Sequence, residues 1–272
     1  MYTVTQRAQK FKQPYGGFIR PSAFETIVLD DGKVLNEKEN IPPTLIGIVV
    51  DYMTRMMTGT PFVQAFFPSI QGAEIATRYK CKTEKEFLNE IERLASIGKK
   101  IQGIDDKSII NACKMVSFDV WKRNAIVAIG MNAGDTEVNA DEETTENIRI
   151  MVERGIHMWE IYGPVVKSGF TFEPNGYTDI VSTGDGDYLT ADTMWDYKVS
   201  KSKITSKHTL QLLMYWIMGK HSGKPEFENI DKLGFFNPRL NMVSILETKN
   251  IPKQTILEVE RNVIGYTSTI TE

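Results

Sequence analysis

The sequence predicts an α/β fold, in which the second half of the chain supplies a sheet and the first half is mostly helical. From about residue 44 to residue 161, apolar side chains recur at the three- and four-residue spacing of amphipathic helices. After residue 162 the period changes to alternation, which is typical of strands. A helical pattern over Ser202–Gly219 lies between the last two predicted strands. This order favours a sheet onto which one helix crosses back.

Length and composition exclude several classes of protein. The chain has 272 residues, enough for one large core or two small ones, and 41% hydrophobic and 25% charged residues are ordinary for a globular protein. A net charge of −3 argues against indiscriminate coating of polyanions but permits a local basic groove. No apolar run reaches membrane-spanning length, and Met1–Gln13 does not resemble a signal peptide. We therefore expect a cytoplasmic protein with no membrane partner.

The domain organisation is predicted from the absence of a linker rich in Pro, Gly and Ser. We expect a single domain over 1–272, with an N-terminal arm at 1–43, a helical part at 44–161 and a sheet core at 162–272. In the helical part, Pro42-Pro43 precedes a helix over Thr44–Thr58. Asp51 lies within its apolar run and needs solvent, a base or a metal as partner. Thr83 and Glu86 form a capping-box signal for another helix.

The predicted strands place acidic and basic side chains together. Strands are expected over 165–173, 177–183, 188–199 and 234–247, with turns at 174–176 and 184–187. Because strand side chains alternate, Asp196 and Lys198 share one face while Trp195, Tyr197 and Val199 share the other. A hairpin between the second and third strands would bring Asp179 beside Asp196.

Two adjacent carboxylates repel one another unless a proton or cation lies between them. With only Cys81, Cys113 and three scattered histidines in the chain, a metal would be held chiefly by oxygen, which favours magnesium or manganese. Such an ion lowers the pKa of a bound water, and Lys198 could offset charge at a phosphate, so the residues fit phosphodiester hydrolysis. The alternative is an exposed Asp179 and a surface ion pair between Asp196 and Lys198, contributing roughly 0–1 kcal/mol.

Three motifs, G-Y-T-D at 176–179, D-Y-K at 196–198 and Q-L-L-M-Y at 211–215, resemble the PD-(D/E)XK nuclease superfamily in its RecB-like exonuclease branch. The resemblance implies a restriction-endonuclease-like fold: a mixed central sheet flanked by helices, here with a large helical insertion. Thr178 stands where the superfamily has proline. Gly47–Asp51 resembles an earlier element that completes the metal site in this branch, with aspartate in place of histidine.

The resemblance also implies a role for each matching residue. The metal ligands would be Asp179, Asp196, the carbonyl of Tyr197 and, from the earlier helix, Asp51. Lys198 would be the catalytic lysine, and Gln211 and Tyr215 would be the branch's Q-x-x-x-Y pair. Next to the site, the cluster Lys201, Lys203 and Lys207 is expected to contact DNA phosphates.

The sequence thus predicts a Mg²⁺- (or Mn²⁺-) dependent deoxyribonuclease, with exonuclease action expected from the branch and DNA as partner. No phosphate-binding loop of the G-x-x-x-x-G-K-[ST] type is present, so no nucleotide cofactor is expected. One alternative is a nucleic-acid-binding protein on a nuclease scaffold that does not cleave. Another is an interaction module whose acidic segment at 135–146 binds a basic partner. Exo versus endo action, strandedness, polarity, the number of metal ions and oligomeric state stay open.

Overall fold

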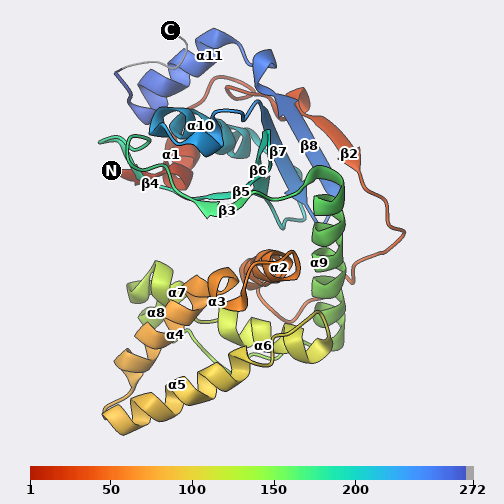
Figure 1. Ribbon diagram of the computed structural model, residues 1–272, viewed down its shortest axis with the longest axis vertical. Helices are drawn as coiled ribbons and strands as arrows, with labels where there is room; N and C mark the ends of the chain where they lie inside the picture. The colour runs from red at the N-terminus through yellow and green to blue at the C-terminus, as the bar shows by residue number, and fades with distance from the viewer. Residues whose placement is uncertain (268–272) are drawn as a thin grey trace. The chain divides into compact units, whose positions relative to one another are not determined.

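Helices and a mixed sheet make up the computed structural model, which describes residues 1–267 (Figure 1). This confirms the predicted α/β class and the mixed character of the sheet. The chain divides into two compact units. The sheet unit comprises Met1–Asp30 and the chain from Trp159 onward, and the helical unit, Asp31–Met158, is inserted between these segments in sequence.

The sheet unit holds all the described strands. Its elements are, in chain order, β1 (Tyr2–Thr3), α1 (Val4–Lys10), η1 (Pro21–Ala23), β2 (Glu25–Val28), β3 (Lys167–Phe170), β4 (Val181–Thr183), β5 (Gly186–Leu189), β6 (Thr193–Tyr197), α10 (Ser206–Ser222), η2 (Pro225–Phe227), β7 (Lys232–Asn237), β8 (Met242–Glu247), η3 (Thr248–Asn250), α11 (Lys253–Glu258) and η4 (Val259–Ile264).

Six strands form the main sheet in the order β2-β8-β7-β6-β5-β3. Strands β6 and β7 are parallel, and every other neighbouring pair in this sheet is antiparallel. The parallel pair requires a crossover, which α10 supplies between β6 and β7. Strands β1 and β4 form a separate parallel pair. The predicted N-terminal arm thus contributes an edge strand, β2, to the main sheet.

Two of the predicted strands are hairpins. Residues 188–199 contain a turn at 190–192, where the Thr190 N–H donates to the Thr193 carbonyl at 3.0 Å, so this segment contributes to both β5 and β6. Residues 234–247 likewise contain β7, a turn and β8, and Asn241 in the turn has a left-handed φ of 48°. The sequence pattern did not reveal these turns because asparagine and aspartate replaced the expected glycine.

The predicted strand over 177–183 and its predicted pairing are wrong. Only Val181–Thr183 is extended, and it pairs with β1. The Thr178 hydroxyl accepts hydrogen bonds from the N–H groups of Ile180 and Val181, at 3.2 and 3.1 Å, while the Thr178 N–H donates to the Val181 carbonyl at 2.9 Å. These local bonds close a turn, because a threonine side chain competes with strand pairing for backbone donors.

The predicted turn at 184–187 is also wrong in its second half. Gly186 begins β5, and a Cβ atom there would overlap the Phe170 ring on the neighbouring strand β3. Glycine is therefore needed at this strand position for close packing, not for a turn.

The two faces of the sheet bury different partners. On one face, α10 packs against β6 and β7, and its Leu213 and Met214 join a core that includes Met194 and Phe235 (Figure 1). On the other face, the Trp195 ring contacts Trp159 and Tyr162 from the end of α9 (Glu142–Tyr162). Helix α10 continues past Gly219, the predicted stop, and ends at Gly223 with a left-handed φ of 71°.

The helical unit confirms the predicted helices over 44–58 and after Thr83. Its further elements are α2 (Pro43–Met57), α3 (Phe62–Ala65), α4 (Phe67–Lys80), α5 (Glu84–Gly98), α6 (Asp106–Val116), α7 (Asp119–Arg123) and α8 (Ala125–Gly130). The predicted capping box is present, because the Thr83 N–H donates to the Glu86 carboxylate and the Glu86 N–H donates to the Thr83 hydroxyl. Within residues 1–267, no helix has the length and hydropathy to cross a membrane.

Gly234 on β7 provides a test of the sheet packing. A Cβ atom at this position would overlap the Trp195 ring, which is 2% exposed and cannot swing away. We expect Gly234→Ala to lower the free energy of unfolding by about 1–3 kcal/mol, as overpacking does in closed cores. Denaturant titration measures the loss. In a Trp195→Leu background, Gly234→Ala should lower the free energy of unfolding by less. If the two substitutions lowered it additively, the overlap between the Cβ atom and the Trp195 ring would be contradicted.

Candidate functional site

Two carboxylates meet where β5 and β6 pair. Tyr188 lies opposite Trp195 in this antiparallel pair, so the register continues with Asp187 opposite Asp196. Directly opposed residues direct their side chains to the same face. The Asp187 Oδ2 atom accepts a hydrogen bond of 2.8 Å from the Tyr197 N–H, which ties the start of β5 to the end of β6. The structure thus places Asp187, and not the predicted strand residue Asp179, across from Asp196.

Lys198 completes this carboxylate pair, as the alternating pattern predicted. Its Nζ atom lies 2.9 Å from Asp196 Oδ1, and the side chains of Lys198 and Asp196 are 25% and 3% exposed. The Lys198 N–H donates to the Phe236 carbonyl at 2.9 Å, so the strand register is kept beyond β6. Burial lowers the pKa of Lys198, but the charges of Asp196 and Asp187 outweigh it and the net pKa is raised. The lysine therefore stays positively charged.

Asp196 has one oxygen that its neighbours leave unused. Its Oδ1 atom accepts from Lys198, whereas Oδ2 is buried without a hydrogen-bond partner among residues 1–267. A buried carboxylate oxygen without a partner is costly, since burial removes its water. The feature is typical of a site that gains a cation or a donor from a ligand.

Helix α10 directs three polar side chains towards this face. The Gln211 amide donates to the Tyr215 hydroxyl at 3.0 Å and to the Thr5 hydroxyl at 3.1 Å. Burial, together with the charges of Asp187 and Asp196, raises the pKa of Tyr215, so its hydroxyl keeps its proton. The sequence motif thus forms a bonded pair that is electrostatically coupled to both carboxylates.

His208, one turn before Gln211, is the third of these side chains. Its Nδ1 atom accepts a hydrogen bond of 3.2 Å from the Thr205 N–H, which caps the start of α10 and favours the neutral imidazole. Burial and the charge of Lys198 lower the pKa of His208, and Asp196 partly opposes this shift. The helical spacing in the sequence does not reveal this cap.

The remaining predicted site residues lie elsewhere. Asp179 is exposed in the turn that precedes β4. Asp51 belongs to the helical unit, where Arg55 donates to both of its oxygens, at 3.0 and 2.8 Å. The cluster Lys201, Lys203 and Lys207 is exposed, around the start of α10. Within residues 1–267, no group of three or more His, Cys, Asp or Glu side chains is arranged to hold a metal.

A pocket of about 330 Å³ opens beside Lys198 and His208. It lies on the α10 face of the sheet, between η1, the segment 200–204 and the ends of β7 and β8. Phe24, Phe235 and Met242 supply apolar walls. We call it the lysine pocket, since Lys198 joins it to the carboxylate pair.

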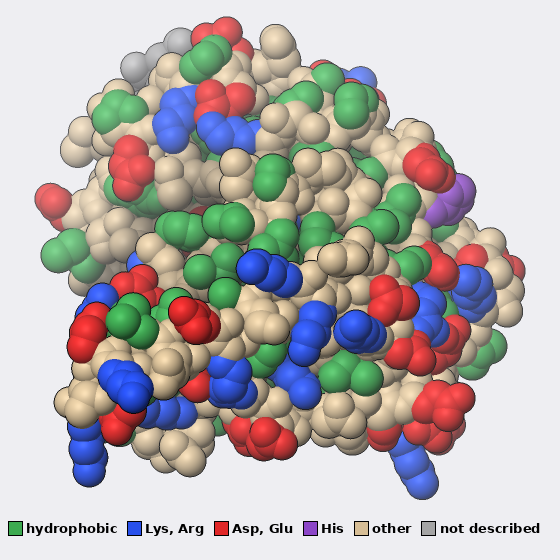
Figure 2. Space-filling model, turned by 60° about the horizontal axis from the view of Figure 1, so that its bottom comes forward, with side chains coloured by type: hydrophobic (Ala, Val, Ile, Leu, Met, Phe, Trp, Pro, Cys, Tyr) green, Lys and Arg blue, Asp and Glu red, His purple; other side chains and the backbone are tan. Residues whose placement is uncertain are grey.

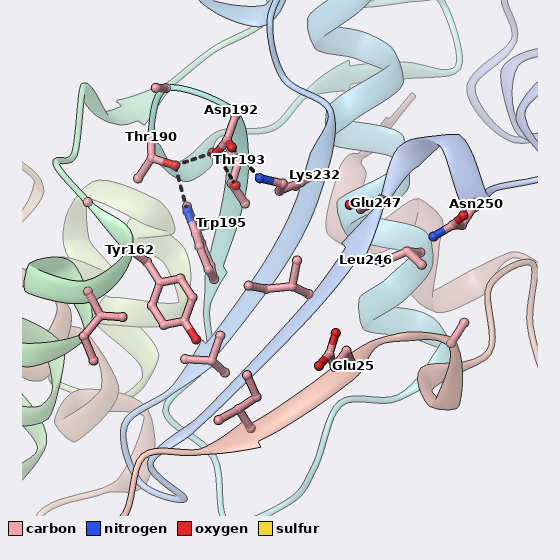
Figure 3. Close-up of a pocket in the computed structure, with 17 residues that line it drawn as sticks. Glu25, Tyr162, Thr190, Asp192, Thr193, Trp195, Lys232, Leu246, Glu247 and Asn250 are labelled. Carbon is pink, nitrogen blue, oxygen red and sulfur yellow. Dashed lines mark hydrogen bonds and ion pairs between the residues drawn. The ribbon is translucent and has the colours of Figure 1, made fainter.

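A larger hollow of about 690 Å³ lies on the other face of the sheet, beside Trp195 (Figure 3). Its polar side chains bind one another: Lys232 pairs with Asp192 at 2.5 Å, and the Trp195 indole donates to Thr190 at 3.2 Å. Glu25 and Glu247 also line it (Figure 3). With three acids against one lysine, this hollow is unfavourable for an anionic substrate despite its size.

Comparisons with known proteins do not identify the chain: no family model, no curated protein and no solved structure matches it.

Asp187 is the residue at this site that sequence reasoning missed. The segment G-D-G-D at 184–187 has the composition of a turn, so its second aspartate was assigned to a hairpin loop. The available signal was the apolar pair Tyr188 and Leu189 directly after Asp187, which is compatible with a strand that begins at Gly186. A strand beginning at Gly186 would have placed Asp187 on the face of Leu189, and hence of Asp196.

The electrostatics of His208 can be tested by titration. We expect the NMR-detected pKa of His208 to lie below the ordinary value of 6.5, with its signals assigned through His208→Gln. Lys198→Met should raise this pKa, because it removes a positive charge and leaves Asp196 uncompensated. Since folded His208 binds a proton less readily than the unfolded chain does, its contribution to stability is present above pH 6.5 and lost on acidification. An unchanged pKa in Lys198→Met would contradict this coupling.

Proposed function

We propose that this protein is a metal-dependent deoxyribonuclease of the PD-(D/E)XK type, hydrolysing phosphodiester bonds at the face formed by Asp187, Asp196 and Lys198. The observation that carries the proposal is the buried Asp196, with one oxygen 2.9 Å from Lys198 and the other without a hydrogen-bond partner among residues 1–267. The motifs D-Y-K and Q-L-L-M-Y support it, because α10 brings Gln211 and Tyr215 to the same face.

The residues present fit Mg²⁺ or Mn²⁺. Asp187 and Asp196 offer carboxylate oxygens, and the Tyr197 carbonyl stays a proposed further ligand. Mg²⁺ is commonly held by one or two carboxylates and keeps several waters, so a protein cage of three acids is not required. When bound, the ion would supply Lewis-acid activation of a water and neutralise charge on the phosphate. The sequence motifs name Asp179 and Asp51 as further ligands, but the proposed ion site does not include them, because Asp179 is exposed and Asp51 is bonded by Arg55.

The side chains then have separable roles. Lys198, held positive by its two acidic neighbours, is placed to stabilise negative charge that develops on the phosphate oxygens. Tyr215 keeps its proton and, with Gln211, offers hydrogen bonds to orient the strand. His208 is neutral near pH 7, so it acts as a hydrogen-bonding group and not as a second cation.

We propose that DNA phosphates contact one small basic area of the surface and not an extended basic face. Lysine and arginine side chains are interspersed with acids over the face that Figure 2 shows, in keeping with a net charge of −3. The exposed cluster Lys201, Lys203 and Lys207 follows directly after Lys198 in the chain and is the proposed phosphate contact. Each neutralised phosphate adds to the salt dependence of binding, so a cluster this small implies a modest dependence.

Removal of Lys198 tests the chemistry. We expect Lys198→Ala to lower the rate of Mg²⁺-dependent hydrolysis of end-labelled DNA by at least about 100-fold, the usual effect of losing one group that stabilises the transition state. The matched control is Lys253→Ala, an exposed lysine at the start of α11 that should leave the rate unchanged. Circular dichroism checks that both variants fold. Wild-type rates in Lys198→Ala would reject the mechanism, and no cleavage by the wild type would favour a binding protein that does not cleave.

Substitution of two aspartates tests which of them acts together with Asp196. The structure places Asp187 opposite Asp196, whereas the sequence motif names Asp179. We expect Asp187→Asn to abolish hydrolysis and to weaken Mn²⁺ binding measured by calorimetry, because it removes a charge opposite Asp196. Asp179→Asn changes an exposed turn residue by the same substitution and should keep activity within a few-fold. If Asp179→Asn abolished hydrolysis and Asp187→Asn did not, Asp179 would be the ligand. Asp187 would then serve only to accept the hydrogen bond from the Tyr197 N–H.

A further inference from the structure

The lysine pocket has the features of a site for a flat, apolar ring attached to an anion. Its apolar walls come from Phe24 and Phe235, whose rings contact one another at 5.3 Å between centroids, and from Ile204, Leu240 and Met242. A volume of about 330 Å³ lies within the range of small-ligand pockets and is enough for a single nucleoside. The pocket is continuous with the proposed catalytic face, because Lys198 lines both.

Charge in the lysine pocket favours an anionic ligand. The described residues that line it include two lysines, Lys198 and Lys203, but no acid. The hollow on the other face of the sheet contains Glu25, Asp192 and Glu247. Of these two cavities in the sheet unit, the lysine pocket is therefore the one compatible with a nucleotide.

Several polar groups of the lysine pocket bind one another. The Thr26 and Ser244 hydroxyls lie 2.8 Å apart, and the Asn237 amide donates to the Ser200 carbonyl at 2.8 Å. Hydroxyl and amide groups that hydrogen-bond one another contribute little to recognising a base by hydrogen bonds to its edge. A ring held chiefly by apolar contact is bound with little sequence preference, as in single-stranded nucleic acid binding proteins.

We propose that the lysine pocket receives the unstacked base of the nucleotide next to the phosphate that is cleaved. The proposal rests on the proposed nuclease function and extends it to the form of the substrate. A base enters such a pocket only after leaving its stack, which costs least in single strands and at frayed ends. The protein is thus expected to prefer single-stranded DNA over intact duplex, with little dependence on base identity.

The experiment compares two tryptophan substitutions on one strand. Met242 and Ile245 are both partly buried on β8, but Met242 lines the lysine pocket and Ile245 lines the hollow on the opposite face. Met242→Trp should lower the rate on single-stranded DNA by roughly 5- to 150-fold, the range that corresponds to the loss of one stacked base. Ile245→Trp should leave it nearly unchanged. Neither residue belongs to the proposed catalytic groups.

A scan with abasic nucleotides then locates the base. Single-stranded oligonucleotides with one abasic position, moved along the strand, should be cleaved slowly only where the missing base adjoins the scissile phosphate. On that oligonucleotide, wild type and Met242→Trp should have equal rates, because two changes that remove the same contact are not additive. Equal effects of Met242→Trp and Ile245→Trp, or additive effects of Met242→Trp and base removal, would overturn the proposal.

Binding without magnesium separates this proposal from the nuclease function. Anisotropy of a fluorescent oligonucleotide in EDTA should show weaker binding by Met242→Trp than by the wild type or Ile245→Trp. If this difference is found and no DNA is cleaved in Mg²⁺, the pocket is supported and the nuclease function is rejected. A different outcome is that DNA is cleaved, that single strands and duplex react equally, and that Met242→Trp matches the wild type in rate and binding. In that case the pocket is rejected and the nuclease function stands.

Discussion

The buried charge of Asp196 is the constraint on which the sheet unit depends. A carboxylate at the centre of a sheet is strongly destabilising unless it is paired, and removal of one partner from a buried pair typically costs about 3–5 kcal/mol. Lys198 Nζ is 2.9 Å from one of its oxygens. Asp187 adds a second negative charge nearby, so the lysine balances two acids. A sheet selected for stability alone would favour an apolar residue at this position, and the arrangement therefore indicates a function that needs the charge.

Helix α10 and the N-terminal segment hold this arrangement in place. The Gln13 side chain donates to the Ser206 carbonyl at 3.1 Å, and the Thr209 hydroxyl donates to the Ile19 carbonyl at 2.7 Å. Together with the bond from Gln211 to Thr5, these contacts fix the first turns of α10 against residues almost two hundred positions earlier. The N-terminal segment thus supports the helix that carries Tyr215, although its composition indicated a surface arm.

The sequence predicted those parts of the site that depend on local periodicity. A period of two placed Asp196 and Lys198 on one face, and the spacing of Gln211 and Tyr215 placed them one turn apart, as the structure shows. The identity of the opposing acid depends on strand register, which a local side-chain turn and a contact between neighbouring strands decide. The Thr178 hydroxyl bonds that close a turn and the Phe170 ring against Gly186 shift the pairing from Asp179 to Asp187. Neither contact has a signal in a single sequence.

Asp51 shows that a match to a sequence motif does not by itself establish the role of one residue. Arg55 lies one helical turn further along α2 and bonds both of its oxygens, and the two side chains are 14% and 19% exposed, Arg55 being the less exposed. Ligation of a metal by Asp51 would have to break this two-point contact and leave the largely buried Arg55 guanidinium without that acceptor, which is unfavourable. In the sheet unit, Asp187 accepts from the Tyr197 N–H and Asp196 pairs with Lys198, and these contacts lie at the ends of neighbouring strands. For an ion that retains most of its water, two strand-borne carboxylates and a phosphate suffice, so the chemistry proposed for this chain does not require the aspartate of the helical unit.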